Sequence, residues 1–305
     1  MTTAPTPDAA PPPDAAPGTP ATSADGEPPA LEVTGLSRRF GGLFALRDVT
    51  LSVPAGARFG IIGPNGAGKT TLFNVLSGEL RPTSGTIAMN GRNITRLSPP
   101  RRAALGLGRT FQITRLFTDL TVRENLTLAI GGLSRSKLQM LRPWRSYRSQ
   151  QRRAGELAAS FGLGDRLDLR PAELSHGELR ELEVLLALAA DPAVLLLDEP
   201  AAGLSPAERV DIQELITRLP ASLTVVVIEH DMNVLREVVD ELAVLHLGEL
   251  VTQGATEQVQ RDPAVREIYL GSGDAGSGGG AGGGSAGSSG AGAKRDADAE
   301  GAGEQ

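Results

Sequence analysis

The feature that most restricts how this chain can fold is a glycine-rich segment, Gly63-Pro-Asn-Gly-Ala-Gly68-Lys69-Thr70. It follows the short apolar run Arg58–Ile62 and precedes a helix-like stretch from Thr70 to Ser77. Glycines at this spacing let backbone N–H groups point inward around a phosphate chain, while the lysine reaches the terminal phosphates and the threonine hydroxyl can bind Mg²⁺. The segment predicts a strand, a phosphate-binding loop and a helix. The residues expected at the nucleotide are Gly63, Pro64, Asn65, Gly66, Ala67, Gly68, Lys69, Thr70 and Thr71.

Lysine is rare in this chain, which gives Lys69 added weight. Of the 30 basic residues only Lys69, Lys137 and Lys294 are lysines, and the rest are arginines. A compact ammonium group fits a phosphate loop, whereas a planar guanidinium group does not. The retention of lysine at this position therefore favours a phosphate-binding role over a glycine-rich helix start without function.

Strand-like and helix-like segments alternate along the chain. The runs Val194–Leu197 and Thr224–Ile228 are apolar without alternation, as expected of strands buried on both faces. Helix starts are marked by capping boxes at Thr121–Glu124, Ser175–Glu178 and Ser205–Glu208. This order predicts an α/β fold with a mainly parallel sheet.

The two ends of the chain differ in composition from its centre. Residues 1–29 hold nine of the 21 prolines, and residues 271–305 hold 14 of the 38 glycines. Neither end has enough large apolar residues to offset the entropy of folding, so both are predicted to be disordered tails. The folded domain is predicted to span residues 30–270, with a helical subdomain at about 115–190.

Composition excludes several classes of protein. There is no cysteine, so no disulfide framework or thiolate metal site can form. No run of 18 apolar residues is present, and the first residues are rich in Pro and Asp. We therefore expect a protein without a membrane span or signal peptide that stays in the cytoplasm. The tails carry charges of −4 and −3, which leaves residues 30–270 at +1, so we expect no nucleic-acid partner.

Acidic residues and a histidine follow the two buried strands. Asp198 and Glu199 come directly after the first strand, and His230 follows the second. Ligands of α/β proteins bind at this carboxyl edge of the sheet. Asp198 would bind Mg²⁺, Glu199 would orient and deprotonate the attacking water, and His230 would hydrogen-bond the γ-phosphate. The alternative interpretation is that Asp198 and Glu199 are solvated acids at the end of a strand and that His230 has a structural role.

The order of these motifs resembles that of the ATP-binding subunits of ABC transporters, over nearly all of residues 30–270. The resemblance rests on the glycine loop, on Gly108-Arg-Thr-Phe-Gln112, on Leu174-Ser-His-Gly-Glu178, on Asp198 and Glu199, and on His230. Leu174–Glu178 resembles the signature motif of the family, in which His176 and Glu178 replace the usual glycine and glutamine. Ser205 stands where aspartate is common in the family.

The resemblance implies a P-loop ATPase core with a mainly parallel sheet, an antiparallel β subdomain and an α-helical subdomain. It implies ATP and Mg²⁺ as ligands and ATP hydrolysis as the reaction. Phe40 is expected to stack on the adenine, and Gln112 to contact Mg²⁺ and the permease. Ser175, Gly177 and Glu178 are expected to contact the ATP of a second ATP-binding subunit, in a head-to-tail dimer.

Other segments resemble the ATPases of branched-chain amino acid importers. They include Arg38–Ala45, Gly108–Phe117 and Val265–Gly271. The implied partners are two integral membrane permease subunits, a second ATP-binding subunit (a copy or a sister ATPase) and, indirectly, an extracytoplasmic solute-binding protein. The implied location is the cytoplasmic face of the membrane. A urea or amide importer, an exporter and a soluble ABC ATPase acting on nucleic acid or ribosomes remain alternatives.

Residues 135–153 form a basic segment without acidic residues, interleaved with Trp144 and Tyr147. The simplest interpretation is a solvated helical surface. A contact with the permease or with anionic lipid is the alternative, since basic residues near such a surface are each worth about 1 kcal/mol. Its basic residues are Arg135, Lys137, Arg142, Arg145, Arg148, Arg152 and Arg153.

Overall fold

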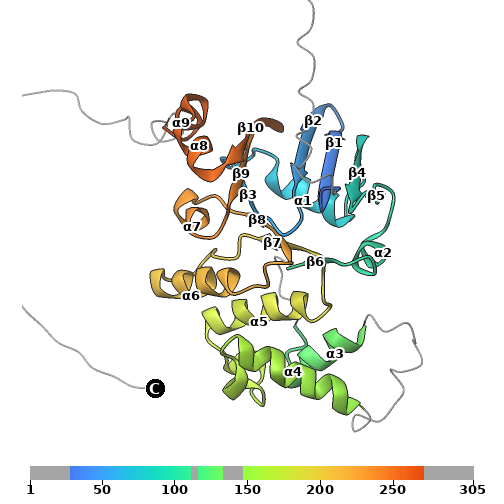
Figure 1. Cartoon of the computed structure of the whole chain (residues 1–305), viewed down its shortest axis with the longest axis vertical. Coiled ribbons are helices and arrows are strands. Elements are labelled where there is room, and N and C mark those ends of the chain that lie inside the picture. Colours follow the sequence, from blue (N-terminus) through green and yellow to red (C-terminus); the bar gives the residue numbers. More distant parts are fainter. Residues whose placement is uncertain (1–27, 111–115, 133–146, 271–305) are drawn as a thin grey trace, which may run out of the picture.

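A large β-sheet forms the centre of the molecule (Figure 1). The computed structural model describes residues 28–110, 116–132 and 147–270. The large sheet has six strands, and its spatial order is β10 (Glu249–Ala255), β9 (Glu241–His246), β3 (Arg58–Ile62), β8 (Thr224–Ile228), β7 (Val194–Asp198) and β6 (Leu107–Arg109). All neighbours pair in parallel except β10 and β9, which pair antiparallel.

A second, antiparallel sheet lies beside the first (Figure 1). Its spatial order is β2 (Leu43–Val53), β1 (Leu31–Phe40), β4 (Ser84–Met89) and β5 (Arg92–Asn93). The predicted combination of a mainly parallel sheet with an antiparallel β unit is therefore confirmed.

Strands β7 and β8 are buried on both faces, as their apolar sequences predicted. In β7, Leu195 and Leu197 belong to one hydrophobic core, and Val194 and Leu196 belong to the other. Strand β8 divides its residues between the two cores in the same alternating way. Because successive side chains of a strand point to opposite faces, each of these apolar strands contributes to both cores.

Helices cover both faces of the large sheet (Figure 1). Helix α1 (Lys69–Ser77) contributes to the core shared with the antiparallel sheet, and α5 (His176–Leu188) and α6 (Pro206–Thr217) pack on the opposite face. The remaining helices are α2 (Pro99–Ala103), α3 (Val122–Gly132), α4 (Arg148–Ser160), α7 (Met232–Arg236), α8 (Thr256–Arg261) and α9 (Pro263–Leu270), with 3₁₀ turns η3 (Gly164–Arg166) and η4 (Pro171–Glu173).

The three predicted capping boxes are confirmed. The hydroxyls of Thr121, Ser175 and Ser205 each accept a hydrogen bond from the backbone N–H of the glutamate three residues later. Each glutamate carboxylate accepts the N–H of its capping residue in return. The helix predicted to end near Ala190 ends at Leu188, two residues earlier, because the chain turns at Asp191, whose φ is +55°.

The carboxyl end of α1 is held by Arg102, which is 1 % exposed. Its guanidinium donates to the carbonyls of Val75 and Leu76 at 2.7 and 2.6 Å, and to those of Leu97 and Thr95 at 3.1 and 3.0 Å. Burial lowers the pKa of Arg102 to about 10. The last turn of a helix has carbonyls without partners in the helix, and Arg102 satisfies two of them. It thus fixes the helix that starts at the glycine loop.

Candidate nucleotide-binding and hydrolysis site

The glycine loop connects β3 to α1 and encloses the side chain of Lys69. Its ammonium donates to the carbonyls of Gly63 and Pro64 at 2.6 and 3.1 Å, and Lys69 is only 6 % exposed. Gly68 has φ +101°, and a Cβ there would lie 2.5 Å from the carbonyl oxygen of Ala45. The loop can therefore approach β2 this closely only with glycine at this position.

A cleft of about 530 Å³ opens over this loop. One wall is the segment between β1 and β2 with the start of β2, and Glu199 and Leu247 complete the cleft. The structure thus brings seven of the predicted loop residues and the predicted base, Glu199, to one cavity. The lining residues are Gly42, Leu43, Phe44, Ala45, Arg47, Asn65, Gly66, Ala67, Gly68, Lys69, Thr70, Thr71, Glu199 and Leu247.

Three acidic groups lie close enough to Lys69 to affect its pKa. Burial lowers the pKa of Lys69, and the charges of Glu199, Glu229 and Asp198 oppose this shift. Burial likewise raises the pKa of Asp198 and of Glu229, which are 2 % and 1 % exposed. The site therefore concentrates both signs of charge at the edge of the sheet, where burial strengthens electrostatic interactions.

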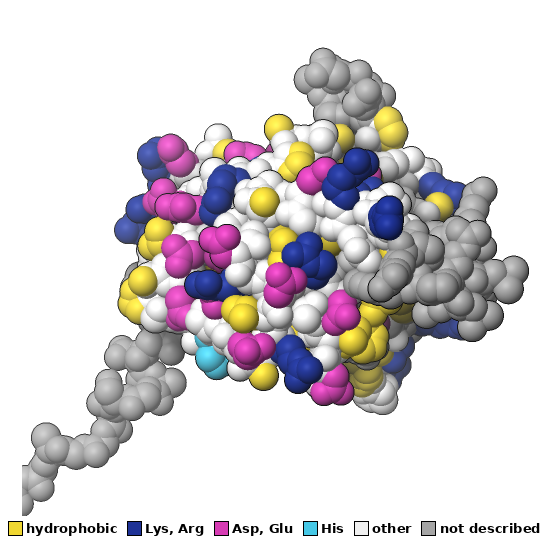
Figure 2. Space-filling model, turned by 90° about the horizontal axis from the view of Figure 1, so that it is seen from below, with side chains coloured by type: hydrophobic (Ala, Val, Ile, Leu, Met, Phe, Trp, Pro, Cys, Tyr) yellow, Lys and Arg dark blue, Asp and Glu magenta, His cyan; other side chains and the backbone are white. Residues whose placement is uncertain are grey.

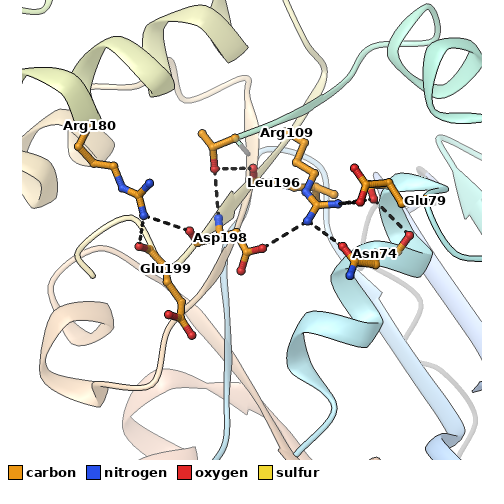
Figure 3. A network of polar contacts seen from close by, with 9 residues as sticks. Asn74, Glu79, Arg109, Arg180, Leu196, Asp198 and Glu199 are labelled. Carbon is orange, nitrogen blue, oxygen red and sulfur yellow. Dashed lines mark hydrogen bonds and ion pairs between the residues drawn. The ribbon is translucent and has the colours of Figure 1, made fainter. Parts of the chain in front are cut away.

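Arg109, which belongs to a motif that carries the resemblance, was not predicted as a site residue from the sequence. Its guanidinium lies 3.3 Å from a carboxylate oxygen of Asp198 and bonds Ser77 and Asn74 of α1 at 2.6 and 2.8 Å (Figure 3). Glu79 lies 3.3 Å away on the other side. Arg109 thus connects α1 to the predicted Mg²⁺ ligand. The signal in the sequence was a charged residue at the end of a short strand-like segment, Leu107–Arg109. In the structure this strand, β6, pairs with β7, which ends at Asp198.

Glu199 begins the loop after β7 and has φ +45°, a conformation that costs a non-glycine residue about 1–3 kcal/mol. Its N–H donates to the carbonyl of Ile228 at 2.9 Å, and its carbonyl accepts the N–H of Ala202 at 3.0 Å. These contacts hold the backbone so that the side chain lines the cleft.

His230 follows β8, as predicted, and more than half of its side chain is exposed. Its Nδ1 lies 3.6 Å from a carboxylate oxygen of Glu229, whose other oxygen accepts the N–H of Ala201 at 2.9 Å. Glu229 therefore connects His230 to the loop after Glu199. Glu229 was not predicted as a site residue from the sequence.

The signature segment begins α5 and does not line the cleft. Glu178, which replaces the usual glutamine, pairs with Arg166 at 2.6 Å and accepts the N–H of Ser175 at 2.8 Å. Hydrogen bonding to Arg166 lowers the pKa of Glu178. The N–H of Gly177 donates to Glu208 of α6 at 3.0 Å, and a Cβ at Gly177 would lie 3.1 Å from that side chain.

Two phenylalanines lie near the cleft. Phe40, the predicted adenine contact, is 44 % exposed, and the guanidinium of Arg38 lies 4.5 Å from its ring centroid. Phe40 is not among the lining residues, whereas Phe44 is. Gln112 lies outside the described residues.

The oxygen donors at the site suit Mg²⁺. Thr70 supplies an exposed hydroxyl and Asp198 a carboxylate, and Mg²⁺ in nucleotide sites is usually held by one or two such groups together with phosphate oxygens. Among the described residues, no cluster of three or more His, Asp or Glu side chains could hold a metal ion by itself. The residues therefore fit a cation that arrives with a nucleotide.

The basic segment is only partly described, since Arg135, Lys137, Arg142 and Arg145 lie outside the described residues. Arg152 pairs with Glu156 at 3.7 Å, and Arg153 pairs with Asp191 at 3.4 Å. On the face drawn in Figure 2, Lys and Arg side chains are interspersed with Asp and Glu. Two arginines of the segment are thus paired with acidic residues outside it.

The phosphate loop, the acidic strand end and the parallel sheet define an ATPase of the P-loop class. Residues 46–202 match the family model described as "ABC transporter", and residues 249–275 match "Branched-chain amino acid ATP-binding cassette transporter". The chain belongs to the ABC transporter family, as an ATP-binding protein.

Relatives and solved structures agree with this assignment. The chain is 40% identical to the high-affinity branched-chain amino acid transport ATP-binding protein BraF of Pseudomonas aeruginosa over 250 residues, covering 80% of this chain and 98% of BraF. It is 38% identical to LivG of Escherichia coli, with the same coverage. A crystal structure of an ABC transporter cassette in its ADP conformation is 32% identical, with a TM-score of 0.71, and the match covers 80% of this chain and 99% of that one.

Replacing Arg109 by methionine should destabilise the fold. Asp198 would remain buried without its charge partner, and removing one member of a buried pair costs about 3–5 kcal/mol. Urea unfolding of both proteins measures the difference. In the control Arg261→Met, an ion pair more than 80 % exposed is lost, and a change of about 1 kcal/mol or less is expected. Equal losses in the two variants would contradict the role of Arg109.

Replacing Glu229 by glutamine should make stability less dependent on pH. Burial raises the pKa of Glu229 in the folded chain, so the folded chain binds this proton more tightly than the unfolded chain does. Stability is then lost as pH rises from 4.5, its usual pKa, through the raised value. We expect Glu229→Gln to be more stable than the wild type at about pH 8 and to lose this advantage near pH 4.5. Urea unfolding across this range, with exposed Glu257→Gln as control, tests it. A constant difference at all pH values would contradict it.

Proposed function

We propose that the chain is the ATP-binding subunit of an importer that takes up branched-chain amino acids through separate permease subunits. The match of residues 249–275 to the branched-chain amino acid cassette model carries this proposal, because it covers β10 to α9, outside the ATPase motifs that importers and exporters share. The identity to BraF and LivG over most of the chain adds support.

Hydrolysis of ATP needs positioning and charge stabilisation more than covalent chemistry. Backbone N–H groups of Gly66, Gly68 and their neighbours would surround the phosphates, and Lys69 would exchange its present carbonyl partners for phosphate oxygens. Thr70 and Asp198 would hold Mg²⁺, which neutralises phosphate charge when bound.

Glu199 and His230 would act on the water and the terminal phosphate. Glu199 lines the same cleft as the phosphate loop, which supports a position of its carboxylate beside the attacking water. In that position it would accept the proton of the water. His230, connected to Glu229, would hydrogen-bond the γ-phosphate. Phe40 and Gln112 are proposed to contact the adenine and Mg²⁺, respectively.

The signature residues would serve a second ATP-binding subunit. Ser175, Gly177 and Glu178 do not line the cleft, which supports a role for them in a half-site different from that of the phosphate loop. The amino end of a helix suits an anion, and the N–H of Gly177 would exchange its present partner, Glu208, for a phosphate oxygen. A head-to-tail dimer would place each signature over the ATP of the other subunit.

The chain would reach the membrane through its partners. No helix of the described residues is long and apolar enough to cross a bilayer. We propose that it binds two permeases at the cytoplasmic face of the membrane and serves, through them, an extracytoplasmic solute-binding protein.

An exporter subunit is the second candidate. The chain is 33% identical to the lipopolysaccharide export system ATP-binding protein LptB of Acidithiobacillus ferridurans over 242 residues. The lower identity, and the match of residues 249–275, favour the importer.

Replacing Glu199 by glutamine should nearly stop hydrolysis and leave ATP binding intact. The amide keeps the shape of the side chain but cannot accept the proton, and loss of a general base costs about 10²–10⁴ in rate. Single-turnover hydrolysis and binding of a fluorescent ATP analogue measure the two effects. Light scattering should show an ATP-dependent dimer. Glu257→Gln, an exposed substitution, is the matched control. Near-wild-type hydrolysis by Glu199→Gln would refute the assignment.

Uptake of labelled solutes tests the transport function. In cells whose own copy of the gene carries Glu199→Gln, we expect uptake of leucine to fall to background and uptake of urea to stay unchanged. Cells carrying Arg261→Lys serve as control, since that ion pair is exposed. Loss of urea uptake alone would assign the chain to a urea importer. Unchanged uptake of both solutes would contradict an importer of either kind and would leave the exporter as the candidate.

A further inference from the structure

Arg180 connects the helix that carries the signature to the loop that carries Glu199. It lies in the second turn of α5, and its side chain is 15 % exposed. Its Nε donates to the carbonyl of Pro200 at 3.0 Å, and one terminal nitrogen donates to the carbonyls of Glu199 and Asp198 (Figure 3). Three consecutive backbone carbonyls, from the last residue of β7 into the loop, therefore accept hydrogen bonds from one guanidinium group.

The other terminal nitrogen of Arg180 is held by Glu183, one turn further along α5. The two groups are 2.6 Å apart, and the Glu183 side chain is 9 % exposed. Charge-assisted hydrogen bonds of this kind are short and strong, and they fix the plane of the guanidinium. Glu183 thus orients Arg180 toward the loop.

The loop needs such support because Glu199 has an unfavourable backbone conformation. Its φ of +45° persists only where surrounding contacts determine it. The N–H of Glu199 is bound by the carbonyl of Ile228, and the N–H of Ala201 is bound by Glu229. The carbonyls of residues 198–200 are bound by the charged guanidinium group of Arg180.

Arg180 does not reach the reacting groups itself. The Glu199 side chain points away from Arg180 in Figure 3 and lines the cleft, whereas Arg180 does not line it. Any effect on hydrolysis must pass through the position of Glu199. Lysine cannot replace this function, because a single ammonium group lacks the planar set of donors that spans Glu183 and the carbonyls of the loop.

We propose that Arg180 is a positioning residue for ATP hydrolysis: it holds the backbone of residues 198–200 so that the Glu199 carboxylate faces the cleft. It makes the orientation of the base depend on the helix whose first residues form the signature. This inference rests on the role proposed above for Glu199.

A double-mutant cycle tests the inference. In the full chain, Arg180→Lys should lower kcat roughly 10- to 100-fold, since misplacement of a catalytic group by about 1 Å has an effect of this size. The KM for ATP should stay within about twofold, because Arg180 does not line the cleft. In a Glu199→Gln background, the same substitution should change the residual single-turnover rate by less than about twofold, because the group that it positions is already lost.

The matched control is Arg218→Lys. Arg218 also donates to a backbone carbonyl, that of Glu214 at 3.3 Å, but at the exposed end of α6. It should leave kcat unchanged in both backgrounds. If Arg180→Lys does not fold, Glu183→Gln provides the same comparison, because it removes the charge that orients Arg180 and keeps a hydrogen-bond acceptor.

Three outcomes would overturn the inference. Unchanged kcat in Arg180→Lys is one, and a raised KM with unchanged kcat is another. The third is an equal fold-loss with and without Glu199, which would mean that Arg180 acts independently of that residue. A Glu199→Gln variant with near-wild-type turnover would overturn both this inference and the proposed role of Glu199, and the single variant shows this separately from any result for Arg180.

Discussion

The parallel pairing of β3, β8 and β7 is the constraint on which the site depends. Parallel neighbours end at the same edge of a sheet, so the glycine loop, the Asp198–Glu199 pair and the Glu229–His230 pair must meet there. The pairing is held in register by strands that contribute alternate residues to two cores. A different pairing of these strands would separate the loops.

Concentrating charge at this edge has a cost that the surroundings offset. Lys69, Asp198 and Glu229 are all nearly buried, and burial opposes the charged form of each. Arg109 compensates Asp198, and the carboxylates compensate Lys69. A buried ion pair adds little net stability, but removing one partner is expensive. The charges are therefore tied to one another and to the fold.

The signature helix is bound to the rest of the site through two charged side chains. Glu208 of α6 accepts a hydrogen bond from the N–H of Gly177. Arg180 of α5 donates hydrogen bonds to the carbonyls of Glu199 and Pro200. The amino end of α5 and the loop of Glu199 are thus parts of one hydrogen-bonded unit, although they belong to different half-sites in the proposed dimer. A movement of α5 would therefore displace the backbone of the loop that carries Glu199.

The class of fold, the phosphate loop and the helix starts can be predicted from the sequence, because they depend on local patterns. Gly63–Thr70, the apolar strands and the three capping boxes each specify their structure within a few residues. The residues that lie beside these segments are known only from the folded chain. Arg109 and Arg180 contact Asp198 and Glu199 from elements 89 and 19 residues away along the chain. Phe44, rather than Phe40, lines the cleft because the turn between β1 and β2 sets which ring faces the loop. Such contacts follow from the packing of distant segments, which no local pattern specifies.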